Sequence, residues 1–216
     1  MQSEKQYIDL YAECAPMIKS HSADIMNVVR DEAFENFKAL GFPSRKVERY
    51  KYTDIPKLFE PNYGLNLNRL DIPVNPYDAF RCDVPNLSTS LYFVVNDSFY
   101  KNALPKGHLP EGVIVNSLCD VAKQCPELIA KYYAKLANTA EDGITALNTM
   151  LAQDGLFVYV PKGVKIDRAI QVINVLRSDV DMMINRRVLI VLEDGAEAKF
   201  LFCDHAADIA ISLLLR

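Results

Sequence analysis

The sequence predicts an α+β fold, with a mainly helical N-terminal part followed by a β-rich part. The first forty residues have apolar side chains at helical spacing. After Gly155 the chain instead contains five strand-like apolar runs, joined by turn-bearing segments that carry no helix signal. Helices first and strands afterwards are typical of α+β proteins. We therefore expect a helical domain over residues 1–154 and a second unit over residues 155–216.

The N-terminal elements follow from periodicity and from helix start and stop signals. Apolar residues recur at helical spacing over residues 25–40; Ser22 can cap the start of this helix and Gly41 can end it. A second, short helix is expected over residues 53–59. Residues 60–85 contain four prolines and several asparagines, which indicate an irregular connection.

The middle of the chain carries two short strand signals before helical spacing returns. The run LYFVV, residues 91–95, predicts a buried strand, and residues 113–118 predict another. Helical spacing then extends over residues 119–152, with Gly143 separating two helices. The five later runs are LFVYV, IQVINVL, VLIVL, AKFLF and IAISLLL. Consecutive short strands joined by turns are compatible with a meander, a barrel or a solenoid. In a solenoid, each coil buries its apolar face against the next coil.

Composition excludes several classes of protein. The net charge of −4 and the lack of a long basic run argue against a nucleic-acid-binding protein. The five cysteines form no Cys-x-x-Cys pair, which fits reduced thiols better than a disulfide framework. The N-terminus has no signal-peptide pattern, and the apolar runs are too short to span a bilayer. These features predict a cytoplasmic protein.

Cys203 and His205 are the best candidate pair for metal ligands. Residues two apart in a strand face the same side, so both side chains could reach one ion. Structural zinc takes four ligands, however, and Asp204 would point the other way. His205 could also act as a base for a nucleophilic Cys203, but no orienting group is marked. We interpret Cys203 as a packing residue and His205 as a surface residue, and we expect no catalytic, cofactor-binding or metal-binding residue.

Aromatic and basic residues alternate in the segment at 43–59. Tyr50, Tyr52 and Phe59 lie among Arg49, Lys51 and Lys57, and such an arrangement can stack on single-stranded nucleic acid. The alternative is a helix-entry segment that packs its aromatic rings and solvates its charges. The acidic net charge favours the second interpretation.

ERYKYTDIPKLF, residues 48–59, resembles a signature near the N-terminus of the SufB/SufD family of iron–sulfur cluster assembly proteins, in particular of its SufD branch. LYFVVNDSFYKNALPKGHLPEGVIVNSL resembles its small strand-bearing segment, although Asp97 stands where glycine is frequent. ALNTMLAQDGLFVYVPKGVKIDRAIQVINVL, residues 146–176, is similar to the entry into the family's β-helix.

The resemblance implies a non-enzymatic scaffold. Family members of this kind pair with the paralogue SufB through their β-helices and bind the ATPase SufC through a C-terminal helical region. A cluster is held only transiently in the full complex, so no cofactor is expected on this chain. The fold implied for residues 155–216 is the start of a right-handed β-helix.

The family pattern continues for roughly as long again, so we expect this chain to be an N-terminal portion. Relatives continue after Asp208 with Asp-Arg-Asn-Phe-Leu-Ala-Thr-Gln, and a one-nucleotide shift within one coding of that peptide yields residues 209–216. We hypothesise such a frameshift, with impaired function and self-association through an open β-helix end. Two alternatives remain: a stand-alone interaction module, or an enzyme that uses Cys203 and His205.

Overall fold

The computed structural model describes the chain except for residues 1, 80–87, 103, 106–107, 207–211 and 216. In chain order its helical segments are α1 (Gln2–Ser20), α2 (Asp24–Asn27), α3 (Arg30–Leu40), η1 (Glu48–Tyr50), α4 (Ile55–Leu58), α5 (Pro76–Ala79), α6 (Leu118–Gln124), α7 (Pro126–Tyr132) and α8 (Gly143–Leu151). Its strands are β1 (Thr89–Val95), β2 (Ser98–Phe99), β3 (Ile114–Ser117), β4 (Gly155–Val160), β5 (Ala169–Leu176), β6 (Met182–Asn185), β7 (Arg187–Leu192), β8 (Phe200–Ala206) and β9 (Ser212–Leu215). The expected α+β composition is confirmed.

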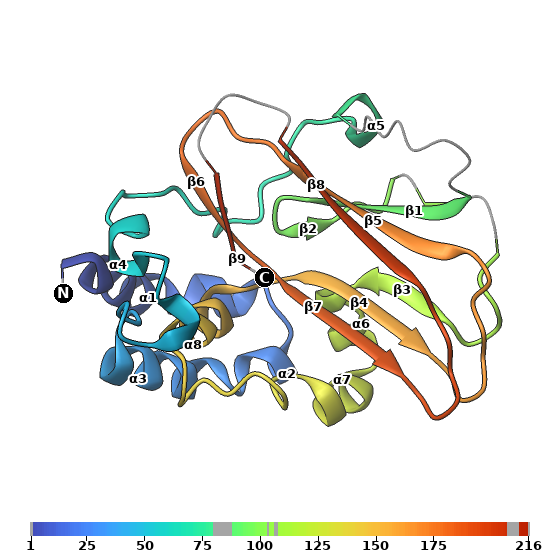
Figure 1. The fold of residues 1–216 in the computed structure, drawn as a ribbon, viewed down its shortest axis with the longest axis horizontal. Helices are drawn as coiled ribbons and strands as arrows, with labels where there is room; N and C mark the ends of the chain where they lie inside the picture. Colours follow the sequence, from blue (N-terminus) through green and yellow to red (C-terminus); the bar gives the residue numbers. More distant parts are fainter. Residues whose placement is uncertain (1, 80–87, 103, 106–107, 207–211, 216) are drawn as a thin grey trace.

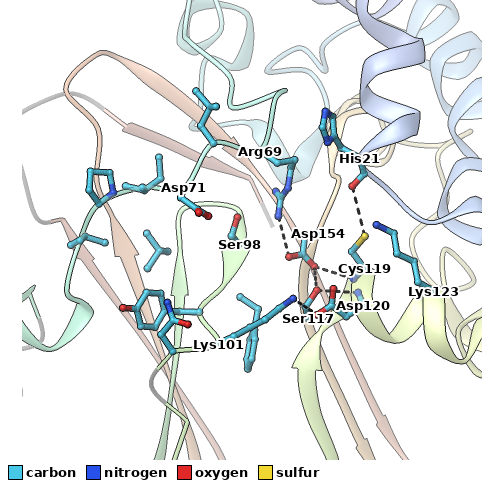
Figure 2. A pocket seen from close by; sticks show the side chains of 18 of the residues that line it. His21, Arg69, Asp71, Ser98, Lys101, Ser117, Cys119, Asp120, Lys123 and Asp154 are labelled. Atoms are coloured by element: carbon cyan, nitrogen blue, oxygen red, sulfur yellow. Dashed lines mark hydrogen bonds and ion pairs between the residues drawn. The ribbon is translucent and has the colours of Figure 1, made fainter.

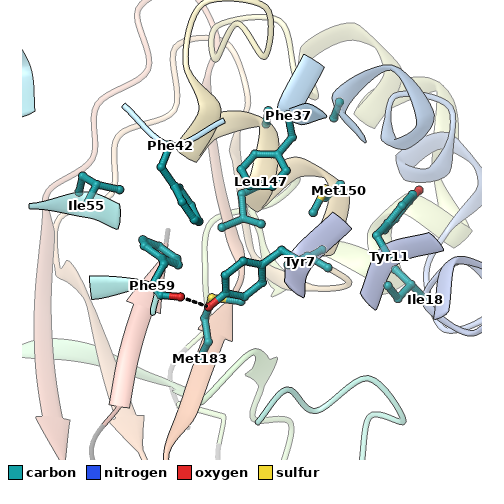
Figure 3. Packing of buried hydrophobic residues seen from close by; sticks show 13 residues of the cluster. Tyr7, Tyr11, Ile18, Phe37, Phe42, Ile55, Phe59, Leu147, Met150 and Met183 are labelled. Carbon is teal, nitrogen blue, oxygen red and sulfur yellow. Dashed lines mark hydrogen bonds between the residues drawn. The ribbon is translucent and has the colours of Figure 1, made fainter. Parts of the chain in front are cut away.

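Helices α1, α3, α4 and α8 gather at the end of the molecule that holds the N-terminus, around an aromatic core (Figures 1 and 3). Tyr7 meets Phe42 and Phe59 edge to face, with ring centroids 5.9 and 5.7 Å apart. Phe42 and Phe59 stack at 4.4 Å. Leu147 and Met150 of α8 complete the contact from the other side. Such ring pairs stabilise a fold by roughly 0.5–1.5 kcal/mol each beyond the effect of area burial. Because Tyr7 lies in α1 and Phe59 ends the signature segment at 48–59, the ring contacts join these two parts of the chain.

Two glycines allow α3 and α8 to meet backbone to backbone. Gly41 ends α3 with a φ of 62°, and its N–H donates to the carbonyl of Phe37 at 2.8 Å. Gly143 begins α8, and a Cβ atom there would lie only 1.8 Å from the carbonyl oxygen of Gly41. The predicted role of Gly41 as a helix stop is confirmed, and the contact explains why Gly143 is also glycine.

A buried arginine closes the C-terminal end of α8. Arg30 is 0% exposed, and its guanidinium donates to the carbonyls of Thr149, Met150 and Ala152. These carbonyls lie in the last turn of the helix and beyond it, where backbone acceptors lack helical partners. The expected cap by Ser22 is wrong: its hydroxyl accepts from Arg30 at 2.7 Å, and α2 begins without a side-chain cap.

The strands form three sheets with mixed pairing. In the first, β1 is antiparallel to β2 and parallel to β5, and β5 is parallel to β8. In the second, β4 lies between antiparallel β3 and parallel β7. In the third, β6 and β9 are parallel. Strands β1 and β3 come from the segment before residue 154, so the sheets combine strands from both sides of the expected domain boundary, which stays a prediction.

Strands β4, β5 and β6 recur in the same order as β7, β8 and β9, and each lies beside its counterpart (Figure 1). The partners are 30 to 32 residues apart in sequence, and side-chain pairs such as Asn174 with Asp204 and Lys165 with Glu197 follow the same spacing. Gly155 is required at the start of this repeat, because a Cβ atom there would lie 1.8 Å from the carbonyl oxygen of Arg187. Apolar side chains from successive strands pack together between the pairs.

Strand β6 differs from the sequence-based expectation, which places its residues, MMIN, in a turn-bearing connection. Four residues with one polar member are too short to show a strand periodicity. The strand is identified by its tertiary environment, since Met183 and Ile184 are buried. The run at 209–215 contains β9, and residues 209–211 of the hypothesised frameshifted tail lie outside the described residues. Across the part of the chain that the structure describes, no helix has the length and apolar character needed to cross a membrane.

We predict that Arg30→Met lowers the free energy of unfolding by about 3 kcal/mol, because three buried carbonyls lose a charged donor. Urea denaturation measures the change. The matched control is Arg45→Met, since the Arg45 side chain is 62% exposed and should contribute under about 0.5 kcal/mol. Equal changes in the two variants would contradict a structural role for Arg30.

Candidate functional site

The buried carboxylate of Asp154 lies between the end of α8 and the start of β4. One oxygen of Asp154, Oδ1, accepts from the hydroxyl of Ser117 at 2.7 Å and from the backbone N–H of Cys119 at 3.0 Å. Its other oxygen lies 3.1 Å from a guanidinium nitrogen of Arg69. Asp154 is only 5% exposed. This one side chain therefore connects the α8–β4 junction, the β3–α6 junction and the proline-rich connection.

Arg69 links that carboxylate to a second one. It adopts a left-handed backbone conformation, with a φ of 55°, and its guanidinium lies 2.8 Å from Asp97 in the β1–β2 turn. Burial raises the pKa of Asp97; Arg69 lowers it, and the nearby charge of Asp154 raises it. Two buried carboxylates thus share one guanidinium, an arrangement in which each member depends on the others for compensation of its charge. We call these three side chains the Asp–Arg–Asp cluster.

A pocket of about 670 Å³ lies against this cluster (Figure 2). It is bounded by residues 69–74 of the connection, by residues 98–102 of the hairpin, and by α6. Lys101 and Asp120, which both line the pocket, form an ion pair. Figure 2 shows Asp71 on the side of the pocket opposite Lys123. The volume is within the range of small-ligand sites, but the walls carry charges of both signs.

The thiol in this pocket is not activated. Cys119 is 6% exposed, and its Sγ atom donates to the carbonyl of His21 at 3.8 Å. Burial raises the pKa of the Cys119 thiol, and the charge of Asp154 raises it further, against a smaller opposing effect of Lys123. A reactive cysteine requires a lowered pKa. The surroundings of Cys119 therefore favour packing over nucleophilic chemistry.

Cys203 and His205 lie in β8, on the outer edge of the first sheet. Cys203 packs against a cluster that includes Phe93 and Ile173, and it accepts from the amide of Gln171 at 3.6 Å. His205 is half-buried, which differs from the expected surface position. Within the described ranges, no three His, Cys, Asp or Glu side chains lie close enough together to hold a metal ion.

The signature segment at 48–59 turns some of its residues inward. The hydroxyl of Tyr50 donates to Asp142 at 2.6 Å, and burial is the main cause that raises the pKa of Tyr50 to about 12. Asp142 also caps α8 through the N–H of Thr145. Phe59 is 1% exposed and belongs to the aromatic core. Tyr52, in contrast, is 90% exposed.

The Asp–Arg–Asp cluster is not predicted by any local pattern in the sequence. Arg69 and Asp154 are 85 residues apart, and no local pattern connects them. The signal available was the position of Asp154 immediately before a glycine and a fully apolar strand, where an ionised side chain requires a partner. That signal predicts that a partner exists without indicating which residue it is.

We predict that Arg69→Met destabilises the protein by about 3–5 kcal/mol at pH 8, because it leaves two buried carboxylates without their cation. Asp97 already has a raised pKa in the folded state. A carboxyl whose pKa is raised on folding favours the folded state when protonated, so the deficit should shrink as the pH falls to 5. Urea denaturation at both pH values tests this. The exposed Arg168 provides the control Arg168→Met, which should show little change at either pH. A pH-independent deficit would contradict the assignment.

Comparison with known proteins identifies the family that the chain resembles. The family model described as "SufBD protein N-terminal region" matches residues 1–172. The chain is 25% identical to the iron–sulfur cluster assembly protein SufD of Bacillus subtilis over 201 residues, which are 91% of this chain and 44% of that protein. It is 33% identical over 92 residues to an iron–sulfur cluster assembly SufBD family protein of Synechocystis, covering 42% of this chain and 19% of that protein.

A SufBD family protein of Staphylococcus aureus is 30% identical over 91 residues, again 19% of its length. The chain thus spans less than half the length of these relatives. The family match, in contrast, covers most of the chain and includes the helical core, β1, the Asp–Arg–Asp cluster and β4. The chain therefore belongs to the SufBD family of iron–sulfur cluster assembly proteins, whose N-terminal region it contains.

Proposed function

We propose that the chain acts as a non-catalytic scaffold in iron–sulfur cluster assembly. The family match over residues 1–172 carries this proposal. The chemistry of the pocket supports it, because Cys119 has a raised pKa and is enclosed, whereas a nucleophile requires the opposite. The buried charges connect segments of the chain to one another. Their arrangement suits a protein whose role is structural, and we place that role in the cytoplasm as part of this proposal.

We further propose that β4 to β9 are the first two coils of a right-handed β-helix. Three parallel strand pairs at a common spacing of 30 to 32 residues support this assignment. A solenoid buries its apolar face only between stacked coils, and the buried cluster that contains Leu156, Val158 and Ile170 supports the assignment. The residues that follow in longer relatives would extend the same stack.

The partners that fit this proposal are a SufB-like paralogue and a SufC-like ATPase, bound by the whole protein. The family match supports these partners, because the relatives that the chain matches are iron–sulfur cluster assembly proteins of the SufBD family. On this proposal any cluster is cargo of the assembled complex, and this chain alone holds none.

We predict that a chimera restores cluster assembly. Residues 1–206 of this chain would replace the corresponding part of SufD in a Bacillus subtilis strain that lacks its own copy. We expect the activity of an iron–sulfur enzyme such as aconitase to return, and the SufB and SufC proteins of that organism to copurify with the chimera. A chimera that accumulates as a folded protein without restoring activity or retaining the partners would contradict the proposal.

The same chimera separates a scaffold from an enzyme. Cys203→Ala and His205→Ala should each retain at least about half of the restored activity, because neither residue is assigned a chemical role. Aconitase activity and chimera abundance are measured together, so a loss of protein is not mistaken for a loss of function. A tenfold loss of activity at unchanged abundance would favour an enzyme that uses this pair.

A further inference from the structure

The segment at 45–58 turns apolar side chains outward as well as inward. Its inner residues, Ile55 among them, fix it to the helical core. Three apolar residues remain exposed: Val47 is 47% exposed, Leu58 is 43% exposed and Tyr52 is 90% exposed. Packing within the described part of the chain accounts for the inner residues and leaves these three side chains largely open to solvent.

The same segment is basic in an acidic chain. Residues 45–58 contain five Lys or Arg and two Asp or Glu, whereas the whole chain has a net charge of −4. Arg45 and Lys51 form ion pairs with Asp54 and Glu48, at 3.2 and 3.8 Å, and all four side chains are at least 41% exposed. Exposed pairs contribute little to stability, so these cations can exchange their partners readily for those of another molecule.

Two more cations have no ion-pair partner within the described part of the chain, namely Lys46 and Lys57. Lys51 lies over the ring of Tyr52, with its nitrogen 5.6 Å from the centroid. The result is an exposed aromatic ring among exposed positive charges. Aromatic residues and arginine are enriched in the centres of protein interfaces, where an aromatic anchor supplies much of the binding energy.

We propose that the exposed side chains of residues 45–58 form a docking surface for an acidic segment of a partner protein, with Tyr52 as its anchor. Charge complementarity selects the acidic partner, and the exposed apolar side chains require that this segment also carry an apolar residue. The surface lies at the helical end of the molecule, away from the long strands β5 and β8 (Figure 1). It is thus separate from any pairing through strand edges.

Single-stranded nucleic acid is the less favoured occupant. Binding of successive bases needs several exposed aromatic platforms. Of the three aromatic residues in the signature, Phe59 is buried and Tyr50 is held by Asp142. Only Tyr52 presents an open ring, which suits a single anchor contact better than a run of stacked bases.

A photo-crosslinking amino acid placed at position 52 tests the proposal in the organism's own cells. The matched control places it at position 136, since Leu136 is 97% exposed and lies outside the basic segment. Mass spectrometry identifies the crosslinked peptide. We expect position 52, and not position 136, to capture one defined protein segment with net negative charge and at least one apolar residue. No capture above the control, or capture of nucleic acid or of a basic segment, would overturn the proposal.

A second measurement separates docking from folding. The captured segment, synthesised as a labelled peptide, should bind the protein in fluorescence anisotropy, with at least about tenfold weaker affinity for Tyr52→Ala and for the double variant Lys46→Glu, Lys57→Glu. Raising the salt from 50 to 300 mM should weaken binding as well. Both variants should unfold at the wild-type temperature, because all three side chains are exposed. Unchanged affinity in both variants, or tighter binding of a twelve-nucleotide single strand, would reject the acidic-peptide surface.

Discussion

The arrangement of this protein depends on one buried carboxylate. Asp154 lies at the point where the helical part of the chain passes into the parallel strands, and it accepts hydrogen bonds from the β3–α6 junction while it pairs with Arg69. Burying an ionised carboxylate costs several kcal/mol unless it is paired and hydrogen-bonded. The chain satisfies it only when the connection, the hairpin and α6 are all in place. This requirement fixes how the helical end and the strands meet.

The same requirement explains the neighbouring features. The last turn of α8 must end in one position so that Asp154 reaches its partners, and buried Arg30 fixes that position by binding the carbonyls of Thr149, Met150 and Ala152. Gly155 then allows β4 to lie against the start of β7. Residues 149–155 thus combine a charged cap at the end of α8, a buried ion pair at Asp154 and a close backbone contact at Gly155.

The sequence was informative wherever structure is decided locally. The stop at Gly41, the short helix within residues 53–59 and the strand at 91–95 follow from backbone preference and periodicity, and all are found. Strand β6 and the partner of Asp154 could not be predicted, because they depend on segments 30 to 85 residues away. Ser22 failed as a cap for a different reason: the buried guanidinium of Arg30 donates to its hydroxyl at 2.7 Å, and a hydrogen bond from a charged donor is stronger than one from a backbone N–H.

Native-state hydrogen exchange of the chain and of Asp154→Asn tests most directly whether this carboxylate joins the two parts. In the wild type, amides of α6, α8 and β4 should exchange through one common opening with a shared free energy. In Asp154→Asn, the account predicts that α6 exchanges at a distinctly lower free energy than β4, because the link between them is lost. A uniform decrease across all three elements, or no change in any of them, would contradict the central role of Asp154.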